Sequence, residues 1–480
     1  MATGFAHAEG GYFGGQNGAR AAGRAGAFAA RADDLGAMII NPAGLAHLDG
    51  TSLQFANQLS YNAYTYTRAP TVDYRVDRAL PDGSFPTVTF APVHNQQPWQ
   101  PLLPMLGVAS RLGLSNWTFA LAALAPSGIG REQYPQNGGQ RYMLVEREAI
   151  ILSYAASAAW RASDKFGFGA TAQWIHVPRL TYSLIIDGTR SPGEINPVSS
   201  QLDMLTTVTG SDPMTLNAII GAWFRPTPAF ELAVSGQIIP AKIVARSTLR
   251  LEPTGGANLG TLTVKRNNAP ANDVTVTLPL PLLARAAARY RHLVGGVELF
   301  DVELDVEYET WSRVNRFTVD GNHLRVDYGG DHIFIEQIQI EKQWRDTLAV
   351  KLGGDFAVLP SRLTLRAGAF YVTPVAPDAY TSLDFATAAR FGGAAGGSLF
   401  LGRVELSVAY QVRLQPTVNV SESAGRVYQQ VPGSACAPPY TDPQSCSSHT
   451  LGMPGPVVNA GSYQGVSHLV LLDLIYRFRQ

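Results

Sequence analysis

Few residues of this chain have the types and spacing that support catalysis or metal binding. The nine histidines are dispersed and show none of the short spacings that zinc ligands require. They are His7, His47, His94, His176, His292, His323, His332, His449 and His468. The glycine-rich stretch GFGATA at 167–172 lacks the last glycine of a nucleotide-binding loop, and no Gly-x-Ser-x-Gly nucleophile motif occurs. The sequence therefore argues against an enzyme and predicts neither a metal nor a cofactor.

The two cysteines, Cys436 and Cys446, lie ten positions apart in a loop rich in proline and serine. This setting suits a disulfide bond in an oxidising compartment. Two unrelated free thiols are the alternative, which such a polar loop favours less.

Four acidic residues, Asp301, Glu303, Asp305 and Glu307, alternate with apolar residues and so share one face of a predicted strand. On an interior wall they could bind cations or repel anions. The alternative is neutralisation by arginines of neighbouring strands. We favour neutralisation because unpaired buried carboxylates are too costly to ionise.

The composition indicates a β-rich protein that presents apolar side chains to something other than water. Lys and Arg together number 37, as do Asp and Glu, so the charge balance gives no electrostatic footprint for nucleic acid. Only 15% of residues are charged, against roughly 25% in soluble domains. The chain also holds 47 Gly, 20 Phe, 19 Tyr and 7 Trp. A soluble all-β protein with generous loops is the alternative at this point.

The elements that must position these residues are strands, because apolar and polar residues alternate strictly over long segments. From Val404 to Leu414, and again over 300–308, one face is apolar and the other mainly polar. No charge-free apolar run reaches the length of about 18 residues expected of a membrane-crossing helix. Any membrane-crossing part must then be a closed barrel, with the apolar face toward lipid and the polar face toward the lumen.

Fourteen strands are predicted, and three features favour a membrane barrel over a soluble sheet. Many strands run past about ten residues, aromatic residues fall toward strand ends, and short turns alternate with long loops. The predicted strands are 52–67, 101–113, 116–127, 141–160, 166–184, 204–225, 230–252, 272–292, 296–316, 332–356, 362–374, 391–402, 404–418 and 463–478.

The first fifty residues do not alternate and are rich in glycine and alanine. They predict a plug for the lumen, so we divide the chain into an N-terminal hatch, residues 1–50, and a transmembrane β-barrel, residues 51–480. Within the plug, Asn41 is a preferred helix N-cap and Pro42 a preferred first helical residue. A short helix is therefore expected over residues 43–48.

The stretch GRAGAFAARADDLGAMIINPAGLAHLDG at 23–50 resembles the N-terminal hatch of the FadL/TodX family of outer-membrane channels for hydrophobic compounds. The similarity rests on Ala32-Asp33-Asp34 and on Asn41-Pro42-Ala43-Gly44-Leu45-Ala46. Weaker similarities follow along the chain. Residues 124–134 resemble the family's third strand, 167–182 its fifth, 343–354 its tenth and 362–375 its eleventh.

The resemblance implies an all-β fold, a fourteen-stranded antiparallel transmembrane β-barrel with an N-terminal hatch, in the bacterial outer membrane. It also implies passive uptake: an apolar solute lands among the long loops, reaches a site beside the hatch and leaves sideways at a kink in the third strand. Pro126 removes a backbone donor there and Gly128 lets the strand bend, whereas an ordinary strand end at Pro126 is the alternative. The hatch turn Asn41-Pro42-Ala43 is expected to pack against that gap.

The resemblance assigns the ligand less completely. Fatty-acid members hold the carboxylate with two basic residues, and one matching position is Arg345. The other falls on Thr181, with Arg179 two residues away, so Arg179 and Arg345 are the expected ligand-binding residues. We expect long-chain fatty acids first and aromatic hydrocarbons second, with a structural or adhesive barrel as the alternative class. The expected partners are a hydrophobic small molecule and outer-membrane lipid and lipopolysaccharide, without nucleic acid.

Overall fold

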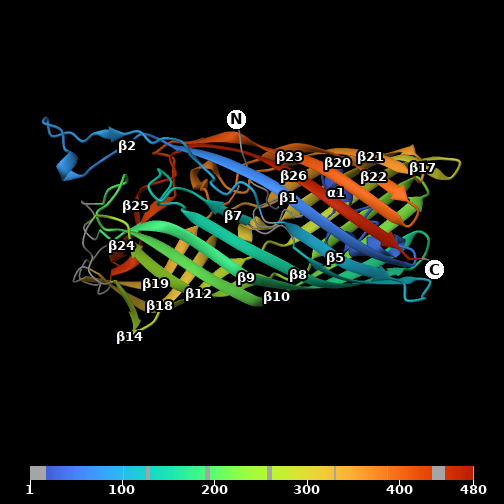
Figure 1. The fold of residues 1–480 in the computed structure, drawn as a ribbon, viewed down its shortest axis with the longest axis horizontal. Coiled ribbons are helices and arrows are strands. Elements are labelled where there is room, and N and C mark those ends of the chain that lie inside the picture. Colours follow the sequence, from blue (N-terminus) through green and yellow to red (C-terminus); the bar gives the residue numbers. More distant parts are fainter. Residues whose placement is uncertain are drawn as a thin grey trace.

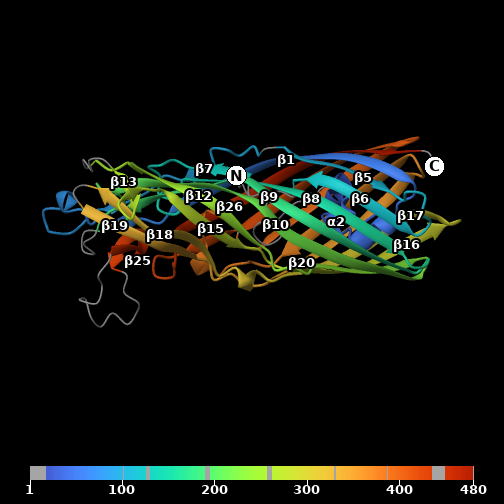
Figure 2. The same ribbon diagram turned by 90° about the horizontal axis from the view of Figure 1, so that it is seen from below.

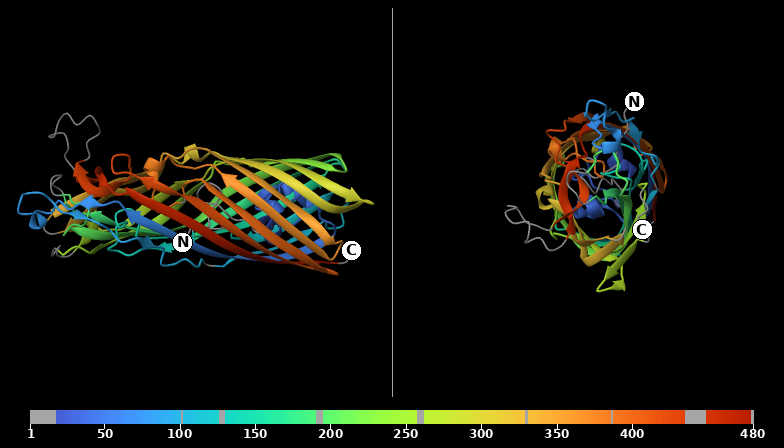
Figure 3. Two further views of the ribbon diagram at one scale, coloured as in Figure 1. Left: turned by 90° about the horizontal axis from the view of Figure 1, so that it is seen from above. Right: turned by 90° about the vertical axis from the view of Figure 1, so that its left-hand side faces the viewer.

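The computed structural model describes residues 18–100, 102–125, 130–189, 195–256, 262–328, 331–385, 387–434 and 449–478. They form an elongated, closed barrel of antiparallel strands (Figure 1 and Figure 2). Residues 18–50, which we call the lumenal segment, lie inside the ring of strands (Figure 3). None of the helices in the described ranges is long and apolar enough to cross a membrane.

Fourteen strand positions make up the barrel wall, as predicted. Some positions hold two consecutive strands separated by a short break. In wall order they are β1 (Thr51–Arg68), β5 (Leu103–Ser110), β6 (Trp117–Leu124) with β7 (Gly130–Gln133), β8 (Glu146–Arg161), β9 (Phe166–Asp187), β10 (Asp203–Thr227), β11 (Phe230–Gln237) with β12 (Lys242–Pro253), β15 (Asp273–Pro279) with β16 (Leu283–Val294), β17 (Val297–Glu309) with β18 (Arg316–Tyr328), β19 (Asp331–Glu341) with β20 (Thr347–Leu359), β21 (Leu363–Val372), β22 (Arg390–Leu401), β23 (Val404–Val420) and β26 (Gly461–Arg477). β1 pairs with β26 along its length, which closes the barrel.

The segments predicted as single strands at 230–252, 272–292 and 332–356 each split into two. The first two breaks contain Pro240 and Pro281, which lack the backbone N–H that a strand ladder needs. Alternation continues across Pro281, and for that reason the sequence predicted one strand at 272–292.

The remaining elements lie in the lumen or in the loops. The lumenal segment holds α1 (Ala19–Gly23), α2 (Ala37–Ile40) and the 3₁₀ helix η1 (Pro42–His47). The loops hold β2 (Thr71–Val72), η2 (Val76–Arg78), β3 (Thr87–Val88), β4 (Val93–His94), β13 (Thr263–Arg266), β14 (Ala269–Pro270), η4 (Trp311–Arg313), η5 (Asp378–Tyr380), β24 (Tyr428–Ser434) and β25 (His449–Val457). The long loops gather at the left end in Figure 1, and the short turns lie at the end that holds the C-terminus. We call the corresponding parts of the barrel the loop half and the turn half.

In the turn half, apolar side chains point outward and charged ones inward, as predicted for a membrane barrel. On β17, Val302 and Leu304 are each 44% exposed, whereas Asp301, Glu303 and Asp305 are at most 2% exposed. This outward apolar face suits contact with lipid, and the inward face lines the lumen.

The predicted neutralisation of the acidic row on β17 is confirmed for Asp301, Glu303 and Glu307, whereas Asp305 accepts hydrogen bonds from the Phe28 and Ala29 amides. Arg289 of the neighbouring β16 contacts Asp301 at 2.5 Å, and Lys351 of the neighbouring β20 contacts Glu307 at 2.6 Å. A further cation comes from the lumenal segment, since Arg24 contacts Asp301 at 2.8 Å. The row therefore serves to hold wall strands and lumenal segment together.

The loop half has the opposite polarity. On β18, Phe317, Leu324 and Val326 point inward and are buried, whereas Arg316 and Asp320 are exposed on the outer face. The inward side chains of β9, β10, β12, β15, β18 and β19 join in one hydrophobic cluster inside this part of the lumen. The expectation of a polar lumen along the whole barrel was wrong here. The reason is length: β10 has 25 residues, whereas about 9–11 cross a bilayer, so the loop half projects beyond the hydrocarbon into water.

Candidate functional site

Asn41, Pro42 and Ala43 open the short helix η1, which begins one residue earlier than expected. The Asn41 Oδ1 atom accepts a hydrogen bond from the Ala43 amide at 3.2 Å, as the side chain of an N-cap does. Its Nδ2 atom donates to the Ala29 carbonyl at 2.8 Å. Asn41 therefore joins two parts of the lumenal segment besides starting the helix.

The wall receives this turn in a hollow made by two glycines. Gly169 of β9 and Gly221 of β10 face each other in the strand register. A Cβ atom on Gly221 would lie 2.0 Å from Asn41 Oδ1, and one on Gly169 would lie 2.4 Å from the Ala43 nitrogen. The Trp223 Nε1 atom donates to the Ala43 carbonyl at 3.1 Å. The turn thus docks on the inner face of β9 and β10.

The gap in the third strand, against which this turn was expected to pack, lies farther along the wall. The break in that strand follows Leu124, which pairs with Ser153 of β8. Gly169 pairs with Ala159, six residues farther along β8, which is roughly 20 Å at about 3.3 Å per residue. The turn packs on β9 and β10 because only glycine leaves room for its backbone there.

The opposite side of the lumenal segment is held by ion pairs. Arg24 is fully buried, and its guanidinium contacts Asp301 at 2.8 Å, Asp355 at 3.0 Å and Glu303 at 2.8 Å. Through these ion pairs the lumenal segment contacts β17 and β20, whereas it contacts β9 and β10 through close backbone packing. In the same segment, burial raises the pKa of the Asp34 carboxyl to about 6.

The described strand ladder of the third wall position is interrupted between β6 and β7, and we call this place the wall opening. Leu124 pairs with Ser153 and Gly130 with Ala149, so the described pairing with β8 stops at Ser153 and resumes at Ala149. A cavity of about 240 Å³ occupies this place. The expected kink residues, Pro126 and Gly128, lie outside the described residues.

The cavity at the opening reaches both faces of the wall. Its lining includes Ser60 and Asn62 of β1, which face the lumen and are buried. It also includes Leu102 and Ile150, which are exposed on the outer face. The cavity is thus lined by side chains of both the lumenal and the outer face.

A second cavity, of about 60 Å³, lies in the lumen of the loop half. Its apolar lining is Ala149, Leu180, Val208, Val276, Leu278, Phe317, Val319, Ile340 and Phe385. Glu148 and Ala149 line both this lumenal cavity and the wall opening. The two spaces therefore adjoin the same stretch of β8.

Two buried cations lie at the lumenal cavity, each paired with a carboxylate. Arg147 is part of the lining and contacts Glu132 at 2.7 Å. Lys342 pairs with Asp384, and its Nζ atom lies 5.2 Å from the ring centre of Phe317, a cation–π distance. The cavity thus offers positive centres beside an apolar wall without adding net charge.

Thr181 supplies a polar group to the same lining. Its side chain is 5% exposed, and its Oγ1 atom has no hydrogen-bond partner within the described part of the chain. A buried polar group without a partner costs roughly 1–3 kcal/mol. A ligand oxygen in the cavity would satisfy this hydroxyl.

The arginines expected to bind ligand lie elsewhere. Arg179 is exposed and contacts Glu148 at 3.0 Å, although Thr181, two residues away, points inward. The register of β9 and β10 is irregular next to these residues, and such a bulge turns Arg179 to the outer face. Arg345 is exposed as well, and the structure does not bring the two arginines together.

Sequence reasoning missed Arg147 and Lys342, although a signal was present. Lys342 continues the inward apolar stripe of Ile338 and Ile340 at the two-residue spacing of a strand. A cation in such a stripe marks a polar site in an apolar wall. The described residues hold no group of His, Cys, Asp or Glu side chains suited to a metal ion, and Cys436 and Cys446 lie outside the described ranges.

Comparison with known proteins bears on the whole arrangement. A family model described as outer membrane protein transport protein (OMPP1/FadL/TodX) matches residues 1–434. No curated protein matches the chain in sequence. Among solved structures, a Pseudomonas aeruginosa FadL homologue superposes with a TM-score of 0.71 at 15% identity, covering 98% of this chain and 100% of that one.

Two toluene transporters have the same fold. The Pseudomonas putida transporter TodX gives a TM-score of 0.60 at 13% identity, covering 93% of this chain and 95% of that one. The Ralstonia pickettii transporter TbuX gives 0.59 at 12% identity, covering 96% and 98%. At these identities the similarity shows the fold alone. The ligand must be inferred from the residues of the site.

Proposed function

We propose that this chain, which belongs to the OMPP1/FadL/TodX family of outer-membrane transport proteins, is a passive uptake channel for long-chain fatty acids. The chain is a β-barrel of the bacterial outer membrane, and its family transports hydrophobic small molecules. The observation that carries the proposal is the stretch of Glu148 and Ala149, which the lumenal cavity and the wall opening share. An apolar molecule can pass there from the lumen into lipid.

The two halves of the barrel divide the route. The apolar lumen of the loop half accepts the ligand, because leaving water gains about 25 cal/mol per Å² of apolar surface. In the turn half the lumenal segment blocks straight passage, so the ligand leaves sideways. In this proposal residues 1–50 are the hatch, Asn41, Pro42 and Ala43 anchor it, residues 51–480 are the barrel, and Pro126 and Gly128 form the kink.

The fatty-acid carboxylate has suitable partners at the lumenal cavity. The Thr181 hydroxyl donates to one carboxylate oxygen. Arg147 and Lys342 stabilise the negative charge while they share their hydrogen bonds with Glu132 and Asp384. These two cations take the role that Arg179 and Arg345 were expected to have.

Aromatic hydrocarbons are the second candidate, because three aromatic rings meet beside the same cavity. The ring centres of Phe317 and Trp344 are 5.5 Å apart, those of Phe317 and Phe385 5.1 Å, and those of Trp344 and Phe385 5.4 Å, all edge to face. A neutral ring packs against such a cluster without needing a cation. A structural or adhesive barrel is the remaining alternative, and outer-membrane lipid and lipopolysaccharide are the proposed surroundings.

The experiment is uptake of labelled oleate, with labelled toluene in parallel, by cells that lack their own transporter and express this chain. Saturable oleate uptake is expected. Ala149→Phe fills the shared stretch of wall and should slow uptake about tenfold. Ala367→Phe, on the outer face of β21, is the matched control and should leave uptake unchanged.

Toluene uptake without oleate uptake would make an aromatic hydrocarbon the ligand in place of a fatty acid. It would also exclude the carboxylate-binding roles of Thr181, Arg147 and Lys342. Uptake of neither probe by a folded barrel would overturn the channel proposal in favour of a structural or adhesive barrel. Equal rates for both variants would overturn the proposed path through the wall.

A further inference from the structure

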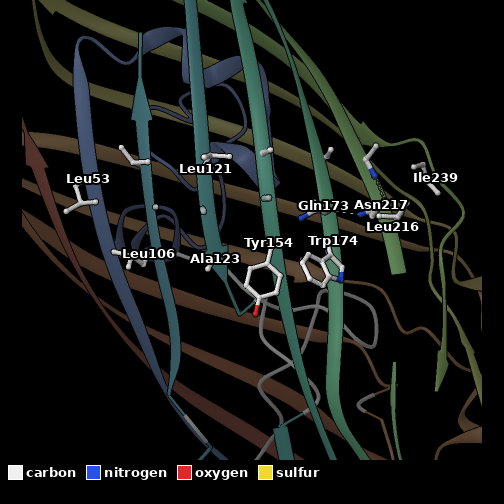
Figure 4. A pocket seen from close by; sticks show the side chains of 17 residues that line it. Leu53, Leu106, Leu121, Ala123, Tyr154, Gln173, Trp174, Leu216, Asn217 and Ile239 are labelled. Atoms are coloured by element: carbon white, nitrogen blue, oxygen red, sulfur yellow. Dashed lines mark hydrogen bonds between the residues drawn. The ribbon is translucent and has the colours of Figure 1, made fainter. Parts of the chain in front are cut away.

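The outer face of the wall carries a groove that the route described so far does not use (Figure 4). Its volume is about 790 Å³, within the range of roughly 300–1,000 Å³ found for small-molecule sites. It crosses β5, β6, β8, β9 and β10. The large side chains around it, among them Leu106, Leu121, Tyr154 and Trp174, are exposed on the outer face.

The floor of the groove is a row of alanines in direct register. Leu121 of β6 pairs with Ala156 of β8, Ala156 with Ala172 of β9, and Ala172 with Ala218 of β10. The groove therefore spans three strand spacings from β6 to β10, or roughly 14 Å. The small alanine side chains on β8, β9 and β10 leave a trough, because the surrounding outer face of the wall carries large side chains.

A ridge separates this floor from the loop half. Tyr154, Trp174 and Leu216 stand in the next register row, and the rings of Tyr154 and Trp174 lie 5.0 Å apart (Figure 4). An acyl chain of a resident lipid that descends from the outer leaflet meets this ridge. The ridge has a low point only at the β6 end of the same row. There the small side chain of Ala123 stands between Leu106 and Tyr154.

That low point adjoins the wall opening. Ala125 lines the opening, and Ala123 lines the groove two residues farther along, roughly 7 Å away. On β8 the opening is lined by residues 148–152 and the groove by residues 154–156, toward the short turn that follows Arg161. The groove therefore continues the opening and leads toward the turn half.

We propose that this groove is an exit site, which holds the apolar chain of the transported molecule after it has left the opening. The inference rests on the proposed function and extends it. The apolar chain of the ligand lies over Ala123, Ala156, Ala172 and Ala218, with Tyr154 and Trp174 along one side. The site thereby guides the ligand toward the periplasmic side of the membrane, since short turns face the periplasm in outer-membrane barrels.

The test fills the floor without touching the lumen. Ala172→Phe places a ring in the middle of the alanine row, and Ala395→Phe adds the same ring to the outer face of β22, away from the groove. Labelled oleate uptake is compared at equal amounts of folded barrel. We expect Ala172→Phe to slow uptake about tenfold and Ala395→Phe to match the wild type.

A second measurement identifies the occupant. Purified barrel in vesicles is irradiated with oleate carrying a diazirine near its methyl end, or with a phospholipid whose acyl chain carries the same group. Labelling by the oleate probe at residues 154–156 and 172–174, in excess over β22, is expected. Equal or stronger labelling of these residues by the phospholipid would make the groove a lipid site and overturn the inference.

The outcomes separate this inference from the proposed function. Absence of oleate uptake by the wild type would remove the proposed function itself. Oleate uptake by the wild type together with equal rates for Ala172→Phe and Ala395→Phe would leave the channel in place and remove only the exit site.

Discussion

The turn half and the loop half of the barrel bury opposite faces of the same alternating pattern. On β17 the charged face is buried and Val302 and Leu304 are exposed, whereas on β18 Phe317 and Leu324 are buried. These two strands share one wall position and are separated only by η4 and its flanking residues. The period of two decides which residues share a face. The medium outside, lipid for one half and water for the other, decides which face is buried.

Arg24→Met should have the largest effect, because it removes the cation that Asp301, Glu303 and Asp355 share in the turn half. Loss of one partner from a buried ion-pair group costs about 3–5 kcal/mol. Heat-modifiability of the folded barrel on gels, followed against urea, measures the loss. Arg78→Met, in an exposed loop, is the control. An unchanged unfolding midpoint for the Arg24 variant would show that these ion pairs do not stabilise the turn half.

The next prediction compares the same substitution in the two halves. Leu324→Ala opens a cavity in the loop half and should cost about 2–5 kcal/mol. Leu304→Ala, on the lipid-facing side of the turn half, should cost less than about 1 kcal/mol. Urea unfolding in the same detergent measures both. Equal losses would mean that the two leucines have similar surroundings, contrary to the inverted polarity.

Lys342→Gln should slow oleate uptake about tenfold, equivalent to 1.4 kcal/mol, and leave toluene uptake unchanged, because only the carboxylate needs the cation. Lys351→Gln is the matched control, since it removes another buried lysine, paired with Glu307, from the turn half. For that variant both uptake rates should follow the amount of folded protein. A parallel loss of toluene and oleate uptake in the Lys342 variant would point to a structural role for Lys342.

The smallest expected effect belongs to Asn41→Ala. Loss of the N-cap costs about 1 kcal/mol, and the barrel should remain folded while the turn loosens from β9 and β10. Oleate uptake is expected to fall, by less than in the Lys342 variant. Asn57→Ala, in the wall strand β1, controls for the loss of an amide. Unchanged uptake by a well-folded Asn41 variant would exclude this turn from the transport path.

Much of the fold could be predicted because the wall depends on local patterns. The alternation of Val404 to Leu414 and of residues 300–308 indicates strands, and the acidic row predicts partner cations. Asn41 followed by Pro42 predicts the start of η1 for an equally local reason. These features need no knowledge of distant residues.

The site could not be predicted in the same way, because distant segments build it. Lys342 pairs with Asp384, and the turn at Asn41 docks on Gly221, a pairing that depends on the strand register. The bulge that separates Arg179 from Thr181 is an exception, because the apolar residues pass from odd positions, Ile175 and Val177, to the even position of Leu180. The inverted loop half could not be predicted either, because the apolar residues of β18 change parity between Val319 and Leu324, where its register with β19 shifts, and alternation does not reveal the medium.

The contacts of the lumenal segment also set an order for assembly. The Ala19 amide donates to Asp473 of β26 at 2.7 Å, and Arg20 contacts Glu405 of β23 at 3.4 Å. Residues from the start of the chain thus find partners on the last two wall strands, and such long loops close slowly. A chain that stops before β26 leaves the Ala19 amide without its carboxylate. Docking of Ala19 and Arg20 in the lumen therefore requires that the last two wall strands are in place.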